Sequence, residues 1–444
     1  MPRVAVVGSG IAGLAAARHL VQAAAGLEVV LLEAGSHFGG HAHTVDVTLS
    51  GVSAGVDTGF LVFNHRTYPL LKQLFEELHV PTAAADMSFS VQVPQPDGRP
   101  GLEWGGSSLQ AVFAQRRNLL KPRFWWMLRE IVRFNRLGTE LAVQAEQGLA
   151  PAEVMQQPVG DFLAQHGFSA ALRDDYLLPM LGCIWSCPTE QMLRFPLATL
   201  LRFCHNHGLM QISDRPQWYT VQGGSRQYVR RVVEQLPDAR LNSPVLALHR
   251  QADGVLLHTA QGAQHFDAVV LACHSDQALA LLGGQASEPE REVLGALRYQ
   301  NNHAVLHTDA SVLPTRRAAW SAWNYERAAQ VGQEHSRVCL HYWLNALQPL
   351  PWQQPVIVSL NPARPIDERQ VLQRIDYSHP VFDLAAIAAQ QRVGALQGQQ
   401  RTWYCGAWLG YGFHEDGLRS GLAAAQALLE QRPSWRTSAA QGAA

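Results

Sequence analysis

Lysine is almost absent from this sequence of 444 residues, because only Lys72 and Lys121 occur among its 35 lysine and arginine residues. No reaction that needs a lysine amine can therefore be assigned to the chain after residue 121. Cysteine is scarce too: six scattered cysteines do not form a disulfide scaffold and suit a reducing compartment. The formal net charge of -1 provides no broad basic field, so we expect no nucleic-acid partner.

Long hydrophobic runs are missing as well. The apolar stretches fall well short of the ~20 residues that cross a bilayer, so no membrane span is predicted. The run Val4–Val7 leads straight into a glycine-rich turn and belongs to the fold rather than to a secretory leader, which predicts a cytoplasmic protein. Cys183 and Cys187, followed by Cys204, suggest a metal cluster at first sight, but their spacing fits no common zinc pattern. No metal site is predicted.

The most specific motif lies at the start of the chain. Val4–Val7 precedes the turn Gly8-Ser9-Gly10-Ile11-Ala12-Gly13, and a helical pattern and a second apolar run follow, ending at Glu33. In such a GxGxxG turn, the first glycine allows the tight bend, the second lets the backbone approach a pyrophosphate, and the third lets helix and strand pack closely. The helix N-terminus faces the phosphates, and the acid accepts hydrogen bonds from a ribose. The predicted dinucleotide-binding residues here are Gly8, Ser9, Gly10, Ala12, Gly13, Glu33 and Ala34.

The following segment distinguishes FAD from NAD. Residues 33–44, Glu-Ala-Gly-Ser-His-Phe-Gly-Gly-His-Ala-His-Thr, resemble the E-A-x-x-x-x-G-G-R-x-x-T signature of the flavin-containing amine oxidase superfamily, with His41 in place of the arginine. The resemblance implies FAD as cofactor, with Gly40 and His41 near its pyrophosphate; a covalent flavin link through His41 is the alternative. Residues 56–60 resemble the next family block, which places Thr58, Gly59 and Phe60 close to the flavin.

Two later segments extend the resemblance. Residues 239–247 read as a strand leading to Val245, where the family's backbone meets adenine. Residues 403–407 read as a strand and turn, and residues 412–421 resemble the family's G-x-x-E-G-A-x-x-S-G segment, whose helix N-terminus stabilises negative charge on the flavin. This sequence departs from the family pattern at Ala407, where many relatives have an acid, and at Asp416, where glycine is usual. The implied cofactor contacts are Val245, Gly406, Gly412, Asp416, Gly417 and Leu418.

The resemblance also implies the organisation of the chain. We expect an α/β fold, in which a Rossmann-type, amine oxidase-like FAD-binding domain carries an α+β substrate domain inserted in discontinuous segments. The FAD-binding domain would comprise residues 1–66, 217–283 and 395–431, and the substrate domain residues 67–216 and 284–394. Helices are predicted over residues 68–78 and 123–146 and a strand over residues 304–307. Residues 432–444 are expected to be a disordered tail.

The missing lysine affects the chemistry that the resemblance implies. Amine oxidases hold a lysine near flavin N5, at the start of the substrate domain's sheet, and the comparable residues 299–307 contain none. We expect His303 at that position. Phe413 matches one of the two aromatic side chains that flank the substrate amine, and the other wall falls near residues 376–382, which include His379. Histidines that titrate near neutral pH suit proton transfer, so His303, His379 and Phe413 are the candidate catalytic residues.

The amino-acid sequences of several segments resemble those of one subgroup of the superfamily. This subgroup comprises bacterial predicted NAD/FAD-binding proteins and the oxidase-like N-terminal region of plant cyclopropane fatty acid synthases. The segments are residues 67–69, 86–90, 184–186, 218–225, 378–382 and 412–417. Bacterial members tend to be encoded beside methyltransferases. This resemblance implies an FAD-dependent oxidoreductase that dehydrogenates a hydrophobic substrate, namely the acyl chain of a methylated or unsaturated lipid, by hydride transfer to flavin N5.

Two other functions stay open. One is an amine oxidase that releases hydrogen peroxide, and the missing lysine argues against it. The other is a non-catalytic flavoprotein that presents lipid to a partner methyltransferase. Residues 119–137 combine basic and large apolar side chains, which fits either a helix resting peripherally on the inner membrane or an ordinary helix buried on one face.

Overall fold

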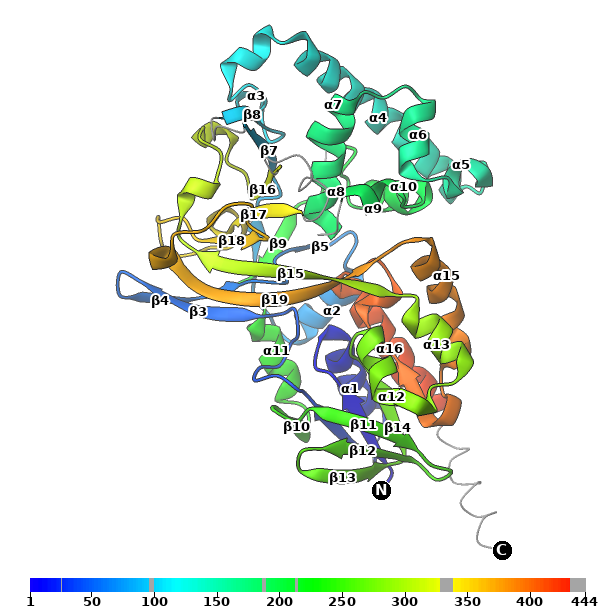
Figure 1. Ribbon diagram of the computed structural model, residues 1–444. Coiled ribbons are helices and arrows are strands. Elements are labelled where there is room, and N and C mark those ends of the chain that lie inside the picture. Colours follow the sequence, from blue (N-terminus) through cyan, green and yellow to red (C-terminus); the bar gives the residue numbers. More distant parts are fainter. Residues whose placement is uncertain (25, 96–99, 186–188, 212–214, 328–337, 432–444) are drawn as a thin grey trace, which may run out of the picture.

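The computed structural model describes residues 1–24, 26–95, 100–185, 189–211, 215–327 and 338–431. A parallel sheet with its helices forms one end of the molecule, a group of helices forms the other, and a mostly antiparallel sheet lies between them (Figure 1). The N-terminus lies beside the parallel sheet (Figure 1). Cys187 and the predicted tail, residues 432–444, lie outside the described residues.

Three distant stretches of the chain build the parallel sheet. Its strand order is β10 (Asp238–Arg240), β2 (Glu28–Leu32), β1 (Arg3–Val7), β14 (Ala268–Leu271) and β20 (Thr402–Tyr404), and every neighbouring pair is parallel. The three central strands are buried on both faces, which explains their nearly continuous apolar sequence. The amine oxidase-like α/β fold predicted from the sequence is confirmed.

Small residues bring two helices together beside this sheet. Helix α1 (Ile11–Ala23) packs against α16 (His414–Gln431), the C-terminal helix, although they lie nearly the whole chain apart. A Cβ atom on Gly421 of α16 would lie 2.1 Å from the carbonyl oxygen of Ala12, and one on Gly417 would lie 2.6 Å from Ile11. The two helices can therefore approach closely only because these positions carry no side chain.

One predicted strand is divided in the structure. Residues 239–247 form β10 and then β11 (Val245–Arg250), which starts an antiparallel meander with β12 (Val255–Thr259) and β13 (Gly262–Phe266). Between β10 and β11 the backbone turns at Asn242, whose φ of 49° is left-handed, and Pro244 follows. The single-strand prediction is wrong because this turn ends the pairing, but Val245 still begins the second strand.

The sheet between the two ends has seven strands. Its order is β19 (Val371–Val381), β15 (Arg298–His307), β18 (Ile357–Leu360), β17 (Cys339–Trp343), β16 (Trp323–Glu326), β7 (Phe89–Pro94) and β8 (Pro100–Gly105). The long antiparallel pair of β15 and β19 passes directly over the parallel-sheet part (Figure 1). The strand predicted over residues 304–307 is present, but β15 begins six residues earlier, at Arg298.

A buried polar chain crosses this sheet. His307 Nε2 lies 2.7 Å from Ser359 Oγ, which lies 2.6 Å from His341 Nδ1, and His341 Nε2 lies 3.0 Å from Glu326. With Cys339, Glu326 and His341 form the one group of three potential metal ligands found among the described residues. Because these polar atoms already bond one another, the group is satisfied without a metal, and the absence of a metal site stays a prediction.

The helical end comes mostly from the first inserted stretch. Helix α2 (Pro69–Glu77) and the long α4 (Pro122–Glu146) match the two helices predicted over residues 68–78 and 123–146. The further helical segments are α3 (Leu109–Val112), η1 (Arg116–Leu120), α5 (Ala152–Gln156), α6 (Val159–Gln165), α7 (Ala170–Leu172), α8 (Leu178–Trp185), α9 (Thr189–Leu193) and α10 (Leu197–Asn206). In the described part of the chain, no helix combines the length and the apolar character needed to cross a membrane.

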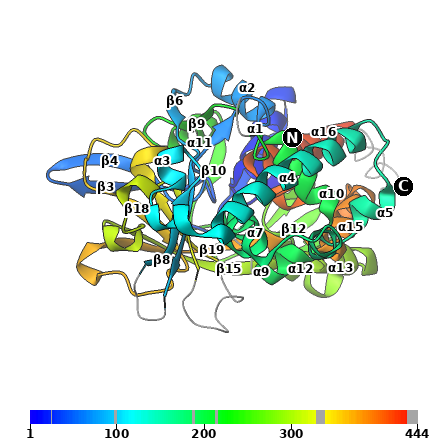
Figure 2. The same ribbon diagram turned by 90° about the horizontal axis from the view of Figure 1, so that it is seen from above.

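The remaining elements connect these parts. A hairpin of β3 (Thr44–Leu49) and β4 (Val52–Asp57) projects to one side of the molecule (Figures 1 and 2). A small sheet contains β5 (Phe63–Asn64), β9 (Trp218–Val221) and β6 (Thr82–Ala85). The other helices are α11 (Arg226–Val233), α12 (Ser275–Leu282), α13 (Glu288–Gly295), α14 (Leu344–Leu347) and α15 (Leu384–Arg392).

Candidate cofactor and substrate site

One large cavity of about 930 Å³ runs from the glycine-rich turn after β1 into the helical end of the molecule. Its walls come from the parallel-sheet part, from β15 and β19, and from α8 and α10. The carboxyl ends of the parallel strands open into it, which is where open α/β sheets bind their ligands.

The glycine-rich turn forms an open cradle at one end of this cavity. Gly8 has a φ of 102°, which favours glycine, and Gly10 caps the N-terminus of α1. A Cβ on Gly13 would lie 1.9 Å from the carbonyl oxygen of Gly8, whereas a Cβ on Gly10 would meet no atom within 4 Å. Gly13 is therefore needed for packing, while Gly10 faces open space beside the helix N-terminus. The geometry fits a pyrophosphate at Gly10.

Glu33 links this cradle to the adenosine end. Its carboxylate accepts hydrogen bonds from the Ser9 N–H at 2.9 Å, from the Ser9 hydroxyl at 2.6 Å and from the Gly35 N–H at 2.8 Å. Beyond it, Ala34, Ser243 and Val245 line the cavity. Glu33 thus stabilises the conformation of the glycine-rich turn, and it lies beside the place where a ribose would bind.

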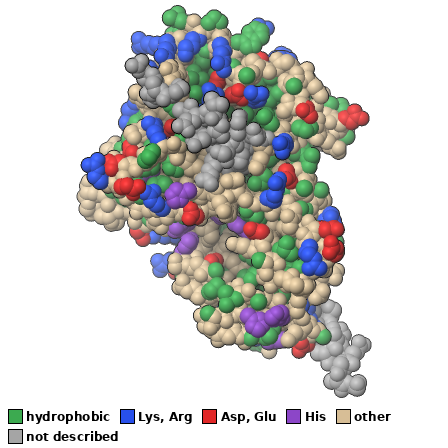
Figure 3. Space-filling model, in the orientation of Figure 1, with side chains coloured by type: hydrophobic (Ala, Val, Ile, Leu, Met, Phe, Trp, Pro, Cys, Tyr) green, Lys and Arg blue, Asp and Glu red, His purple; other side chains and the backbone are tan. Residues whose placement is uncertain are grey.

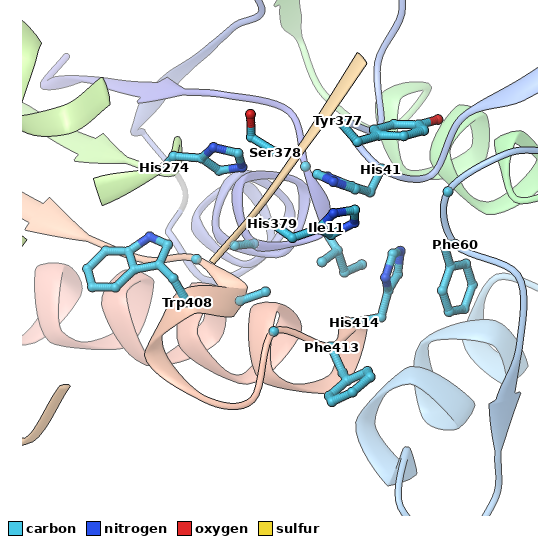
Figure 4. A pocket seen from close by; sticks show the side chains of 18 of the residues that line it. Ile11, His41, Phe60, His274, Tyr377, Ser378, His379, Trp408, Phe413 and His414 are labelled. Carbon is cyan, nitrogen blue, oxygen red and sulfur yellow. The ribbon is translucent and has the colours of Figure 1, made fainter. Parts of the chain in front are cut away.

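Histidines gather in the middle of the cavity. His41, His379 and His414 converge there beside Ile11 (Figure 4). Phe60 lies next to His414, and Tyr377 lies next to His41. The His41 and His379 rings lie 5.3 Å apart, and His414 stacks on Phe60 at 3.6 Å. Burial, followed by the nearby histidines, lowers the pKa of His41 well below its usual value. These three rings are therefore neutral at neutral pH.

The Nε2 atom of His41 is a buried polar atom without a hydrogen-bond partner. Leaving such an atom unpaired costs about 1–3 kcal/mol, so this position suits a ligand that supplies the partner. His41 thereby replaces the family's arginine with a neutral side chain. His41 lines the same cavity as Gly10, and its contact with the pyrophosphate or the flavin stays a prediction.

The proton position on His379 is set by neighbouring amides. The amide nitrogen of Asn361 donates to Asn302 Oδ1 at 2.7 Å, and the amide nitrogen of Asn302 lies 2.7 Å from His379 Nδ1. An NH₂ group only donates, so His379 Nδ1 accepts and its Nε2 carries the proton. Burial lowers the pKa of His379 to about 4. The ring is therefore a neutral N–H donor in the cavity.

The other end of the cavity is aromatic and apolar. Phe413 stacks on Phe203 at 5.0 Å, and His207 stacks on Phe203 at 3.9 Å. The His207 Nδ1–H donates to the carbonyl oxygen of Phe203 at 3.0 Å, which leaves Nε2 with a free lone pair. The further residues that line this end are Tyr68, Met87, Cys183, Ile184, Leu209, Trp218, Trp323, Tyr342 and Ile375.

Charged side chains are few in this cavity. Among the described residues that line it, none is lysine or arginine, and only Glu33 and Asp376 carry carboxylates. Glu33 lies at the nucleotide end, and the Asp376 side chain is 87 % exposed. A substrate at the aromatic end therefore contacts no fixed charge from the described residues.

The structure brings most of the predicted site residues to this cavity. Those that line it are Gly8, Ser9, Gly10, Ala12, Glu33, Ala34, Gly40, His41, Gly59, Phe60, Val245, Gly406, Gly412, His379 and Phe413. Five predicted cofactor residues lie behind its wall instead: Gly13, Thr58, Asp416, Gly417 and Leu418. Thr58 bonds the hydroxyl of Tyr377 at 2.8 Å, and Asp416 accepts the N–H groups of Tyr411 and Phe413 at 3.0 and 3.1 Å.

His303 differs most from its expected position. Its ring bonds Asp376 at 2.8 Å and is 42 % exposed, outside the cavity. Side chains alternate across a strand, and β15 turns Asn302 inward, so its neighbour His303 must face outward. The inward position on this part of the strand is therefore filled by Asn302, which bonds His379 at 2.7 Å.

Sequence reasoning missed His274, which lines the central region, and Asn302, which lies behind the wall and bonds His379; Tyr377 lies within the wall expected near residues 376–382. His274 stacks on Tyr299 at 4.4 Å and lines the cavity. It follows β14 at the carboxyl edge of the parallel sheet, which is a position that could have marked it. Asn302 carried no such signal, because only the strand register shows which side it faces.

The residues present fit FAD. Gly10 leaves space for a pyrophosphate, Glu33 and Val245 lie where the adenosine would be, and the unpaired nitrogen of His41 faces the middle of a cavity at the upper end of ordinary ligand-pocket volumes. Such a fold and site define a dinucleotide-binding flavoprotein of the Rossmann type.

Comparison with known proteins agrees with this class. A family model described as flavin containing amine oxidoreductase matches residues 11–308. The chain therefore belongs to the flavin-containing amine oxidoreductase family, whose members are FAD-dependent oxidoreductases.

Two curated relatives share the name "Putative flavin-containing monoamine oxidase AofH" and come from two strains of Mycobacterium tuberculosis. Each is 27 % identical over 276 residues, which cover 61 % of this chain and 56 % of the relative. The matched region thus spans little more than half the length of these relatives.

Solved structures share the whole fold. A putrescine oxidase triple mutant aligns with a TM-score of 0.67 at 17 % identity, covering 97 % of this chain and 99 % of the other. Cyclohexylamine oxidase from Brevibacterium oxydans IH-35A aligns with a TM-score of 0.65 at 16 % identity and the same coverage. A CLA-producing fatty acid isomerase from P. acnes aligns with a TM-score of 0.64 at 16 % identity, covering 96 % and 98 %. At these identities, the likeness concerns the fold alone.

Proposed function

We propose that this chain is an FAD-dependent oxidoreductase that dehydrogenates a hydrophobic substrate, most specifically the acyl chain of a methylated or unsaturated lipid. The observation that carries this proposal is the aromatic end of the cavity, where apolar side chains from α8, α10, β16 and β17 meet and the described lining holds no fixed charge. A long apolar chain would gain free energy from burial there, at about 25 cal/mol per Å² of apolar surface.

The chemistry that FAD would supply when bound is the acceptance of a hydride from a substrate carbon. The residues of this chain would hold the substrate and remove a proton. Phe413 and Phe203 offer a flat wall against which an acyl chain can lie. His207 is our candidate base, because it lines the aromatic end and its Nε2 lone pair is free. Burial lowers its pKa to about 4, so the ring is neutral at neutral pH. His379, with its proton held on Nε2, would donate a hydrogen bond to the cofactor.

Several finer predictions belong to this proposal. The subgroup resemblance to the oxidase-like region of plant cyclopropane fatty acid synthases supports a lipid substrate, as does the structural neighbour that is named a fatty acid isomerase. We also propose a cytoplasmic protein with a peripheral contact at the inner membrane and a methyltransferase as its partner. The domain boundaries at residues 66, 216, 283, 394 and 431 are part of the same proposal.

Amine oxidation with release of hydrogen peroxide is the second candidate function. It is favoured by the names of the relatives and by Phe413, which lies in the cavity wall. The absence of lysine after residue 121 argues against it, because amine oxidases use a lysine near flavin N5. A non-catalytic flavoprotein that presents lipid to a methyltransferase would retain the same cavity.

The deciding experiment is an anaerobic titration of the FAD-loaded protein, followed by flavin absorbance near its visible maximum. We expect bleaching by phospholipids with unsaturated or methylated acyl chains and a dehydrogenated lipid by mass spectrometry. Monoamines and polyamines should leave the spectrum oxidised. Rapid bleaching by an amine with no response to any lipid would refute the lipid assignment, and an oxidised spectrum with every compound would favour the non-catalytic role.

The proposed role of His207 as the base is tested by a substitution with a matched control. His207→Gln should slow bleaching by the lipid at least about 100-fold, since general-base catalysis contributes about that much, while FAD binding persists. His205→Gln is the matched control, because His205 lies two residues away on α10 and does not line the cavity.

A further inference from the structure

Exposed large apolar side chains are concentrated on one short segment. Six lie within residues 109–132, although the structure describes only thirteen such side chains in all. The six, with their exposed fractions, are Leu109 (79 %), Leu119 (44 %), Leu120 (86 %), Trp125 (48 %), Trp126 (55 %) and Val132 (53 %). They belong to α3, η1 and the first half of α4, at the end of the molecule farthest from the parallel sheet (Figure 1). We name residues 109–136 the tip.

The tip is also strongly basic. It holds seven basic side chains, Arg116, Arg117, Lys121, Arg123, Arg129, Arg133 and Arg136, and one acidic residue, Glu130. Its net charge is therefore +6 (7 − 1), in a chain whose total is -1. Figure 3 shows lysine and arginine side chains gathered around apolar ones at this end. Burial and repulsion from Arg117 and Arg123 lower the pKa of Lys121, which agrees with crowded positive charge.

The tip is firmly attached to the rest of the molecule. On α4, Phe124, Met127 and Phe134 are buried in the core, so the opposite stripe must face outward. The indole N–H of Trp125 donates to the carbonyl oxygen of Leu119 at 2.9 Å, which ties η1 to α4. Glu130, the one acid, is turned inward and accepts the Ser169 N–H at 3.0 Å. The outward surface thus presents apolar and cationic groups on a rigid support.

We propose that the tip is a docking surface for an anionic phospholipid bilayer. Tryptophan and leucine side chains insert at the headgroup boundary, and arginines around them pair with lipid phosphates. A protein partner would need acidic groups matched to fixed positions, whereas a bilayer offers negative charge and apolar depth everywhere the tip touches. The inference rests on the proposed function and deepens it, because docking here would bring membrane acyl chains to the helical end into which the cavity extends.

The test is co-sedimentation of the FAD-loaded protein with vesicles. We expect binding to vesicles that contain phosphatidylglycerol, weak binding to pure phosphatidylcholine vesicles, and loss of binding as salt is raised. Leu120→Ser and Trp126→Ser should each lower the partition coefficient about tenfold, since each removes exposed apolar surface. Arg116→Gln should lower it about fivefold, because each basic residue near an anionic surface contributes about 1 kcal/mol.

The controls are exposed residues elsewhere. Leu246→Ser removes a leucine that is 63 % exposed on β11, and Arg230→Gln removes an arginine that is 80 % exposed on α11. Both should bind vesicles like the parent. Equal binding by the tip variants and these controls would overturn the proposal, and so would absence of binding to anionic vesicles. A dimer in size-exclusion chromatography that Leu120→Ser abolishes would instead make the tip a contact between two copies.

Failure of docking and failure of the proposed function are separable. Vesicle binding is measured without turnover, and the anaerobic titration can use lipids dispersed in detergent. Bleaching by dispersed lipid without vesicle binding would refute the proposed docking surface but not the proposed dehydrogenation. Vesicle binding without bleaching would refute the proposed dehydrogenation but not the docking surface.

Discussion

Gly10 and Gly13 lie one helical turn apart at the start of α1, but their missing side chains serve different purposes. At Gly10 the backbone has a φ of -60° and a ψ of 173°, which alanine adopts freely, and an added Cβ meets no atom. Gly10→Ala should therefore change the free energy of unfolding of the FAD-free protein by less than about 0.5 kcal/mol. It should still weaken FAD binding by about tenfold or more, because the methyl group occupies the space for the pyrophosphate.

Gly13→Ala is the contrasting variant. Its Cβ would lie 1.9 Å from the Gly8 carbonyl oxygen, so the turn itself must move. We expect a loss of more than about 3 kcal/mol in urea unfolding of the FAD-free protein. Equal stability of the two variants, or unchanged FAD affinity in Gly10→Ala by fluorescence titration, would contradict this division of roles.

Asn302 sets the proton position of His379. In Asn302→Asp, a carboxylate would accept from Nδ1–H, which moves the imidazole proton to Nδ1 and raises the pKa of His379. A merely structural residue would alter stability but not the bound cofactor. We expect a shift in the visible absorption bands and in the midpoint potential of bound FAD, measured by spectroelectrochemistry. Asn301→Asp, on the outward side of β15, should leave both unchanged.

The same strand shows why part of the site could be predicted from sequence and part could not. The GxGxxG turn has a physical signature in its glycines, and the residues after it have their family pattern. By contrast, Gln300, Asn301, Asn302 and His303 are all polar, so no hydrophobic alternation shows which face is inward. The register of β15 against β19 decides this, and it places Asn302 rather than His303 in the interior.

At the scale of elements, Glu415 joins two helices that the sequence separates widely. Its two carboxylate oxygens accept the N–H groups of Leu70 and Leu71, each at 3.0 Å, at the start of α2. Free N–H groups at a helix N-terminus need such acceptors, and Glu415 is buried in the first turn of α16. The carboxylate that the family pattern places in this segment therefore fixes α2 against α16.

Glu415→Gln tests this contact. An amide offers only one acceptor oxygen, so its NH₂ group would face the second N–H. We expect a loss of about 1–3 kcal/mol in the free energy of unfolding, measured with urea. The amide hydrogens of residues 70 and 71 should also exchange faster. Glu430→Gln, at an exposed position of the same helix, should change stability by less than about 0.5 kcal/mol.

Element prediction succeeded where packing and local pattern agree. The helix α4 carries a regular buried stripe with a proline at its start, and both its ends match the prediction closely. The division between β10 and β11 was missed because the prediction followed the apolar residues on both sides of Asn242, Ser243 and Pro244, which are typical turn residues. A left-handed asparagine is compatible with many sequences, so periodicity alone does not mark it.

At the scale of the whole molecule, function depends on segments that meet only after folding. The parallel sheet unites β1 and β2 with β10, β14 and β20, and the cavity lies where this sheet meets β15 and β19. Sequence motifs predicted the nucleotide end, because its residues are local. The aromatic end combines residues of α8, α10 and the turn before α16. These segments lie far apart in the sequence, so no local sequence pattern predicts that they come together.

The large number of buried histidines makes the whole molecule sensitive to acid. Burial lowers the pKa of His207, His307 and His379 to about 4 each and that of His414 to about 3. An unfolded histidine has a pKa near 6.5, so between pH 6.5 and 4 the unfolded chain binds protons that the folded chain does not. Stability from these groups is therefore complete above about pH 6.5 and is lost as the pH falls.

Three buried carboxyl groups act in the opposite direction. Burial raises the pKa of Asp57 to about 6 and also raises the pKa values of Asp175 and Asp416, so the folded state takes up these protons first and gains stability as the pH falls. The histidines whose pKa is lowered outnumber these carboxyl groups, and each contributes about 1.4 kcal/mol per pH unit within its window. We expect the free energy of unfolding of the FAD-free protein to fall between pH 6.5 and 4.5, as measured by urea titrations at successive pH values.

His307→Gln provides the residue-level check of this pH dependence, since His307 lies in the buried polar chain of the seven-stranded sheet, away from the cavity. It should reduce the slope of the free energy of unfolding against pH by about one proton. A stability that is flat from pH 6.5 to 5, or a slope in His307→Gln equal to that of the parent, would show that the buried rings do not resist protonation. The acid sensitivity would then have to come from carboxylates, whose pairing is lost only at lower pH.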